Sequence, residues 1–164
     1  MKRLWAPWRL EYILGEKPDC CIFCTMPAED KDRENYILNR GRENFVIMNR
    51  YPYNNGHLMV IPYQHADVLE DLPDSTLSEA MSLTRACCRI IKETMHAQGF
   101  NVGLNVGEAA GAGIKEHLHF HIVPRWAGDT NFMSVIEDTR IMPQHLTESY
   151  EQLLPGFLRL AKGE

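Results

Sequence analysis

Three histidines alternate with large apolar residues over residues 117–122, which read His-Leu-His-Phe-His-Ile. Side chains two positions apart on a β-strand share a face, so this alternation predicts a strand with all three histidines on one side. The apolar residues between them would enter the core on the other side. A glycine-rich segment, Gly111–Gly113, precedes the strand and suits a tight backbone whose N–H groups point outward. Such N–H groups commonly hold phosphate oxygens, so the stretch indicates phosphate chemistry.

The composition is that of one globular domain. The 164 residues are 45% hydrophobic and 24% charged, which suits a single domain over residues 1–164 with short appended ends. A net charge of −5 and a pI near 5.8 argue against a protein that coats nucleic acid and favour a small partner. No run is long enough to span a membrane, and the N-terminus lacks the apolar core of a signal peptide. We therefore expect no nucleic-acid or membrane partner and a cytoplasmic location.

The cysteines raise the question of a metal. Five are present, an odd number that includes the adjacent pairs Cys20-Cys21 and Cys87-Cys88, and this usage suits a reducing compartment better than a disulfide framework. Cys21 and Cys24 have the C-x-x-C spacing that lets a turn present two thiolates to one zinc ion. The same spacing occurs in free or redox-active thiol pairs, and a metal site needs two further ligands from elsewhere.

The patterns elsewhere predict more strands. Residues 36–49 are interpreted as a hairpin around Gly41, residues 57–62 as a strand closed by a proline, and residues 100–107 as a glycine-interrupted strand. The last of these should pair antiparallel with the histidine strand that follows it. His57 and His65 stand alone here, and an isolated histidine is more often a hydrogen-bonded structural residue than a ligand. The aromatic segment Leu4–Ile13 is interpreted as an N-terminal arm packed on its own domain or across a dimer.

Two helices complete the expected fold. The longer should begin at Asp74 or Ser75, either of which would cap it, and run to about Gln98, with Gly99 as its stop. A C-terminal helix should cover about residues 144–160. Apolar and small residues at spacings of three and four form a core stripe on the long helix: Leu77, Ala80, Met81, Thr84, Cys87, Cys88, Ile91 and Met95. The fold class is therefore α+β, an antiparallel sheet of about five strands with one long helix and a C-terminal helix.

Residues 117–123 reproduce the motif of the histidine triad (HIT) superfamily, which this chain resembles. The resemblance extends through residues 46–50 and 56–62, which look like the first half of the nucleotide site in fragile histidine triad proteins. Four further segments are similar to those of bacterial diadenosine tetraphosphate phosphorylase-like HIT proteins: residues 4–9, 111–114, 124–126 and 128–132. The resemblance implies a HIT-like fold, a homodimer, and an enzyme that transfers or hydrolyses nucleotidyl groups.

The resemblance also implies a covalent mechanism. His119 would attack the α-phosphorus to form a nucleotidyl-histidine intermediate, and His121 would bind the phosphate oxygens and help the leaving group. A neutral imidazole is nucleophilic near neutral pH, which supports the first role. The backbone N–H groups of Gly113 and Ile114 would hold the non-bridging oxygens.

Further residues carry over from the family by position. Asn49 matches the residue that binds the ribose hydroxyls, and Asn105 matches an asparagine on the phosphate side. Zinc-containing members imply a ligand set that closes the coordination sphere, so we expect structural zinc. The four ligands would be Cys21, Cys24, His65 and His117.

The identity of the substrate stays open at this stage. Dinucleoside polyphosphates such as diadenosine tetraphosphate are expected, with phosphate or water resolving the intermediate. An adenosine phosphoramidase or acyl-AMP hydrolase and a non-catalytic nucleotide sensor are the alternatives. Many family members have Gln followed by Ser or Thr just before the triad, whereas residues 112–116 here read Ala-Gly-Ile-Lys-Glu. Lys115 and Arg125 would either steer the polyphosphate tail or serve as exposed solubilising charges.

Overall fold

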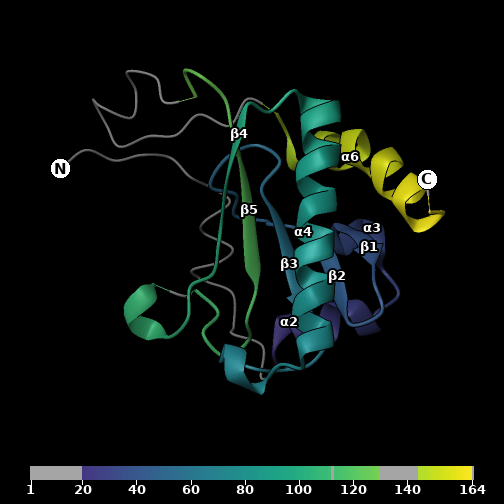
Figure 1. The fold of residues 1–164 in the computed structure, drawn as a ribbon. Helices are drawn as coiled ribbons and strands as arrows, with labels where there is room; N and C mark the ends of the chain where they lie inside the picture. Colours follow the sequence, from purple (N-terminus) through teal and green to yellow (C-terminus); the bar gives the residue numbers. More distant parts are fainter. Residues whose placement is uncertain (1–19, 112, 130–143, 164) are drawn as a thin grey trace.

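A computed structural model describes residues 20–111, 113–129 and 144–163 of the chain. The helices, labelled as in Figure 1, are α2 (Ile22–Thr25), α3 (Asp32–Asn35), α4 (Asp74–Met95) and α6 (Leu146–Ala161). The strands are β1 (Ile37–Arg40), β2 (Asn44–Met48), β3 (Leu58–Pro62), β4 (Gly99–Gly103) and β5 (Phe120–Arg125). Three short 3-10 helices cover Met26–Ala28, Leu69–Asp71 and Glu108–Ala110. The aromatic arm predicted at residues 4–13 lies outside the described residues.

The five strands form one antiparallel sheet in the order β1-β2-β3-β5-β4. This confirms the predicted α+β class, the hairpin of β1 and β2, and the antiparallel pairing of the two strands that flank the glycine-rich segment. β4 is shorter than expected and ends at Gly103, which lies opposite His121 of β5. The order places β3 beside β5, although 57 residues separate the two strands in the sequence.

The long helix α4 crosses one face of the sheet, and α6 packs against both α4 and β1 (Figure 1). Their shared core contains Val60 and Ile122 from the sheet, Cys87 and Ile91 from α4, and Phe157 from α6. Burial of such side chains stabilises each by about 1.5–3 kcal/mol relative to exposure. The predicted stripe is mostly confirmed, but Met81 is 56% exposed and does not belong to the core.

The ends of α4 differ from the prediction. Neither Asp74 nor Ser75 caps the helix, because the residue at its N-cap is Pro73, whose side chain makes no capping hydrogen bond. The helix ends at Met95, and His96, not Gly99, adopts the left-handed conformation that stops it, with φ 54°. The Trp126 indole N–H donates to the Met95 carbonyl 3.1 Å away and thereby supplies a partner for the helix end. The C-terminal helix is confirmed within two residues at each end.

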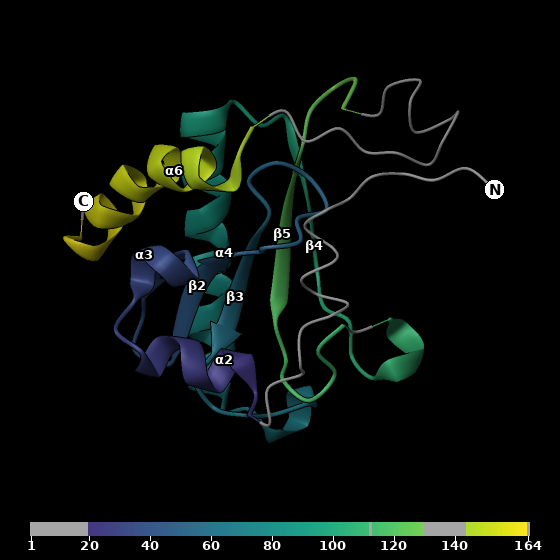
Figure 2. The ribbon, with the colours of Figure 1, turned by 180° about the vertical axis from the view of Figure 1, so that it is seen from behind.

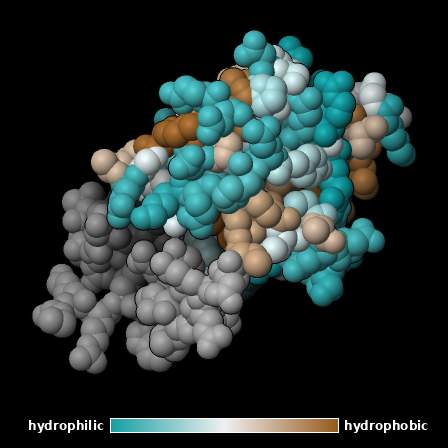
Figure 3. Space-filling model, turned by 90° about the horizontal axis from the view of Figure 1, so that it is seen from below, coloured by the Kyte–Doolittle hydropathy of each residue, from teal (hydrophilic) through white to brown (hydrophobic). Residues whose placement is uncertain are grey.

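The opposite face of the sheet carries a second, smaller core. Phe23 of α2 packs there against Phe45, Ile47, Met59 and Ile61. Figure 2 shows α2 and α3 on this side, across the sheet from α4. Hydrophilic residues cover much of the described surface in Figure 3, with smaller hydrophobic areas between them. No helix among the described residues has the length and apolar character needed to cross a membrane.

Candidate active site and metal centre

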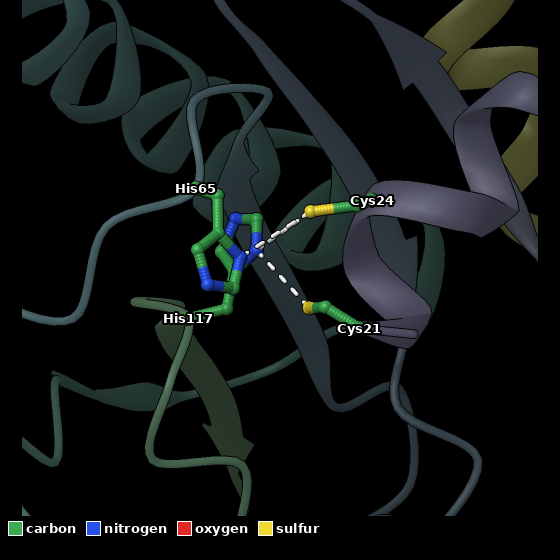
Figure 4. A group of neighbouring side chains, drawn as sticks. All are labelled: Cys21, Cys24, His65 and His117. Carbon is green, nitrogen blue, oxygen red and sulfur yellow. Dashed lines mark hydrogen bonds between the residues drawn. The ribbon is translucent and has the colours of Figure 1, made fainter. Parts of the chain in front are cut away.

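Four sulfur- and nitrogen-bearing side chains meet beside the start of α2 (Figure 4). Their potential ligand atoms all lie within 4.8 Å of one another. Cys21 and Cys24 come from the first turn of α2, His65 from the loop after β3, and His117 from the segment before β5. The fold thus joins the four residues that the family resemblance implies as metal ligands.

The distances in this cluster fit a tetrahedral zinc site. Cys21 Sγ and Cys24 Sγ lie 3.3 and 3.6 Å from His117 Nδ1, and Cys24 Sγ lies 3.4 Å from His65 Nδ1. Tetrahedral bonds of about 2.3 Å to sulfur and 2.1 Å to nitrogen separate such ligand atoms by about 3.6 Å. The donor set, two thiols and two imidazoles, is also one that zinc prefers.

A hydrogen bond orients the His117 ring for this role. His117 Nε2 lies 2.9 Å from the Pro62 carbonyl oxygen, and since a carbonyl only accepts, Nε2 carries the proton. Nδ1 therefore keeps its lone pair toward the two sulfurs. Burial is the main cause of a lowered pKa for His117, which favours the neutral ring that a metal ligand requires.

The predicted histidine strand is shorter than the alternation suggested. β5 begins at Phe120, so His117 and His119 lie in the segment that leads into it, and only His121 belongs to the strand. Pairing with β3 stops at Phe120. If the same register continued, Leu118 would lie opposite Pro62. Proline has no N–H for a ladder hydrogen bond, and the Pro62 carbonyl already accepts from His117.

All three triad histidines are buried, at 1%, 7% and 8% exposure, instead of being displayed on an open platform. The apolar residues between them enter the core as predicted. Leu118 belongs to a small cluster with Ala66 and Leu72, while Phe120 and Ile122 belong to the core under α4.

His119 has one ring nitrogen with a defined proton and one with an available lone pair. Its Nδ1 lies 2.9 Å from the His117 carbonyl oxygen and must donate to it, so the neutral ring carries its lone pair on Nε2. The Phe23 ring packs against this imidazole at a centroid distance of 5.2 Å. Burial lowers the pKa of His119, which favours the neutral form.

His121 is oriented by a second buried histidine. The backbone N–H of Tyr53 donates to His57 Nδ1 at 3.0 Å, so His57 carries its proton on Nε2. That atom lies 2.9 Å from His121 Nδ1 and donates to it. His121 in its neutral form therefore carries its own proton on Nε2, and its ring lies 4.7 Å from that of His119 between centroids.

Burial sets the charge state of this pair. The pKa of His57 is lowered to about 3 and that of His121 to about 4. Burial is the main cause for both, and the charges of neighbouring histidines are the second cause. Both rings are therefore neutral near neutral pH. Two neutral rings share one N–H···N hydrogen bond without electrostatic repulsion.

Sequence reasoning did not assign His57 to the site. It lies fully buried one residue before β3, and the pairing of β3 with β5 brings it to His121. Two signals were available: its position at the start of a predicted strand and its place in residues 56–62, which resemble the family's nucleotide site. Neither states which strands are neighbours. Asn49, the predicted ribose ligand, also belongs to this cluster, since its Nδ2 lies 3.4 Å from His57 Nδ1.

The remaining predicted nucleotide-binding residues lie in the connection between β4 and β5. Asn105 is half-buried and lies two residues beyond Gly103, the partner of His121 in the sheet. Gly113 is exposed, and Ile114 packs against the core that contains Phe23. Within the described part of the chain, no hydrogen bond occupies the backbone N–H groups of Gly113 and Ile114.

Comparison with known proteins identifies the family. The HIT domain family profile matches residues 33–128. An AP-4-A phosphorylase of Mycobacterium tuberculosis is 38% identical over 97% of this chain and 86% of its own length. The adenosine 5'-monophosphoramidase HNT1 of Saccharomyces cerevisiae is 28% identical over 64% of this chain and 62% of its own.

Two solved structures share the fold. A zinc-bound histidine triad family protein from Mycobacterium smegmatis superimposes with a TM-score of 0.71 at 29% identity, over 88% of this chain and 97% of the other. A hypothetical histidine triad nucleotide-binding protein from Sulfolobus tokodaii gives 0.67 at 27% identity, over 87% and 93%. The relatives with named activities are enzymes that process nucleotides, which confirms the expectation of an enzyme of this type. Together with the buried histidine triad, these similarities establish that the chain belongs to the HIT domain family.

Proposed function

We propose that this protein cleaves dinucleoside polyphosphates, such as diadenosine tetraphosphate, by transferring a nucleotidyl group to His119. The observation that carries the proposal is the bond from His119 Nδ1 to the His117 carbonyl at 2.9 Å. It directs the lone pair of the neutral ring to Nε2, the only nitrogen then able to attack. The named activity of the Mycobacterium tuberculosis relative supports the choice of substrate.

The reaction would proceed in two displacements at the same phosphorus atom. His119 Nε2 forms a bond to the α-phosphorus while the bond from that phosphorus to the bridging oxygen breaks, and the rest of the polyphosphate leaves with the electron pair. Phosphate or water then attacks the phosphorus, and the histidine leaves. Phosphate yields ADP and ATP from diadenosine tetraphosphate, and water yields AMP and ATP.

Other residues would hold the reacting groups. The Nε2–H of His121 would donate to a phosphate oxygen and assist the leaving group, because His57 occupies its Nδ1. The N–H groups of Gly113 and Ile114 would bind the non-bridging oxygens where charge develops. Asn49 would bind the ribose hydroxyls, and Asn105 would contact the phosphate side.

The proposal includes structural zinc held by Cys21, Cys24, His65 and His117. The fit of the four donor atoms supports it, as does the zinc in the Mycobacterium smegmatis structure. Four protein ligands leave no open position, so the metal would stabilise the fold and not activate water. It would tie α2 to the segment that carries His119.

We also propose a homodimer in the cytoplasm. Among the described residues, β4 is the strand at one edge of the sheet, and Val102 on it is 47% exposed. None of the five cysteines, all of which lie in the described residues, forms a disulfide, in keeping with a reducing compartment. Light scattering of the purified protein at several concentrations tests the dimer, because a monomeric mass throughout would contradict it.

The decisive experiment is incubation of the protein with diadenosine tetraphosphate, with and without orthophosphate, followed by product analysis. ADP plus ATP formed only with phosphate indicates phosphorolysis, whereas AMP plus ATP without phosphate indicates hydrolysis. Turnover of adenosine phosphoramidate alone would favour the activity named for the yeast relative. His119→Asn should abolish turnover and retain nucleotide binding. A wild-type protein that binds nucleotide but never turns over would refute the proposal and favour a sensor.

A further inference from the structure

The sequence offers two cations near the triad that could contact a polyphosphate tail, Lys115 and Arg125. Their polar partners in the structure differ. The Arg125 guanidinium donates to both carboxylate oxygens of Asp129, at 2.6 and 2.9 Å. It also donates to Asn101 Oδ1 at 3.1 Å. This bidentate pair fixes the fork that would otherwise bind phosphate, and Asp129 in turn accepts from Asn54. Arg125 thus holds the loop after β5.

Lys115 is in a different situation. Within the described ranges, its Nζ has one polar partner, Glu108 Oε2 at 3.2 Å, and both side chains are well exposed, at 59% and 84%. An exposed pair of this kind contributes roughly 0–1 kcal/mol, so its partner is easily exchanged. Lys115 is also the sole Lys or Arg between residues 107 and 117.

The location of Lys115 links it to the reacting histidine. Its neighbour Ile114 packs against the core that contains Phe23, and the Phe23 ring contacts His119. Two residues later the chain reaches His117, whose carbonyl orients His119. Lys115 therefore belongs to the segment that leads to the nucleophile, and its side chain is exposed to solvent.

From these observations we propose that Lys115 determines specificity for a polyphosphate leaving group, and that Glu108 is its counterion in the absence of substrate. This inference rests on the proposed function and specifies which part of the substrate the loop recognises. The phosphates beyond the α-phosphorus would displace the Glu108 carboxylate and bind the ammonium as a point charge. A substrate whose leaving group has no phosphate gains nothing from this contact.

The test compares two substrates in one set of variants. Diadenosine tetraphosphate has a phosphate tail on its leaving group, and adenosine 5'-monophosphoramidate does not. Lys115→Ala should lower kcat/KM for the tetraphosphate by about three- to tenfold at low salt, mainly through KM. It should leave kcat/KM for the phosphoramidate unchanged. Glu108→Gln should lower KM for the tetraphosphate alone, because the counterion no longer competes.

Lys92→Ala, at an exposed position on α4, is the matched control for loss of one positive charge. The inference is wrong if Lys115→Ala changes both substrates equally, changes neither, or resembles Lys92→Ala. It is also wrong if added salt does not reduce the difference between wild type and Lys115→Ala, since the contact is an exposed charge interaction. Absence of turnover with either substrate in the wild type would instead refute the proposed function.

Discussion

His57 Nε2 lies 2.9 Å from His121 Nδ1 in the interior of the protein, and this contact leaves Nε2 as the nitrogen of neutral His121 that carries the proton. The chain of donors begins at the backbone N–H of Tyr53. Because one backbone group sets the tautomer of His57, and His57 sets that of His121, the fold determines which nitrogen of His121 carries the proton.

The first prediction concerns this chain of donors. His57→Leu removes the donor to His121 and should lower kcat by about tenfold to a hundredfold with little change in nucleotide affinity. His57→Gln should recover part of the loss, because an amide N–H can reach the same acceptor. Steady-state kinetics of both variants, with thermal unfolding as a check on folding, would measure this. Equal kcat in the two variants would contradict a role for the hydrogen bond.

The second prediction concerns acid stability. The pKa of His57 falls to about 3 in the fold, while an unfolded histidine titrates near 6.5. Below about pH 6.5 the unfolded chain takes up a proton that the folded chain does not, so the free energy of unfolding should fall as pH falls from about 6.5 toward 3. His57 contributes up to about 1.4 kcal/mol per pH unit to this slope.

Urea unfolding at pH 7, 6 and 5 measures that slope. The slope should be shallower in His57→Gln than in the wild type. The control is His96→Asn, which replaces an exposed histidine by a residue that tolerates the left-handed conformation. This control should keep the wild-type slope. Parallel slopes for the wild type and His57→Gln would show that His57 does not titrate on unfolding.

The third prediction concerns the metal centre. The purified protein should contain about one zinc ion per chain, and Cys24→Ser should lose most of it and unfold at a lower temperature. Cys20 is an exposed thiol next to the cluster and not a member of it, so Cys20→Ser should retain zinc. Metal analysis and thermal unfolding give both readouts. A similar loss in both variants, or in neither, would exclude the proposed ligand set.

The fourth prediction concerns the contact between α4 and α6. A Cβ at Gly156 would lie 2.6 Å from Ile90 Cγ2, closer than real contacts allow. Gly156→Ala should therefore destabilise the protein by about 1–2 kcal/mol despite the higher helix propensity of alanine. Ile90→Leu removes the Cγ2 branch. The double variant should therefore lose less free energy of unfolding than the two single variants lose together. Gly99→Ala has room for the methyl group and serves as control. Additive effects in chemical denaturation would argue against the close contact.

Much of the fold follows from local patterns. The stripe of Ala80, Cys87 and Ile91 predicted the buried face of α4, and the alternation around Phe120 and Ile122 predicted their burial. Most places where prediction and structure differ are the ends of helices and strands, and the exposure of Met81 and the burial of the triad histidines are the exceptions. His96 stops α4 because the chain turns there to begin β4 at Gly99, and Pro62 ends the pairing that would have extended the histidine strand.

The sequence by itself determined the family, the class of fold, and the histidines and cysteines that are candidates for catalysis and metal binding. It could do so because the motif His-Leu-His-Phe-His and the cysteine spacing are local and specific. Only the tertiary structure decided what each of those residues faces. The three triad histidines share a short segment, yet His117 lies against two cysteines, His119 donates to a backbone carbonyl, and His121 accepts from His57. The cysteines beside His117 and the His57 ring beside His121 come from residues far away in the sequence, and no local pattern specifies which strands become neighbours. The sequence also left the roles of Lys115 and Arg125 open, and only their contacts with Glu108 and Asp129 distinguish them, because sequence proximity does not specify which charged side chains pair.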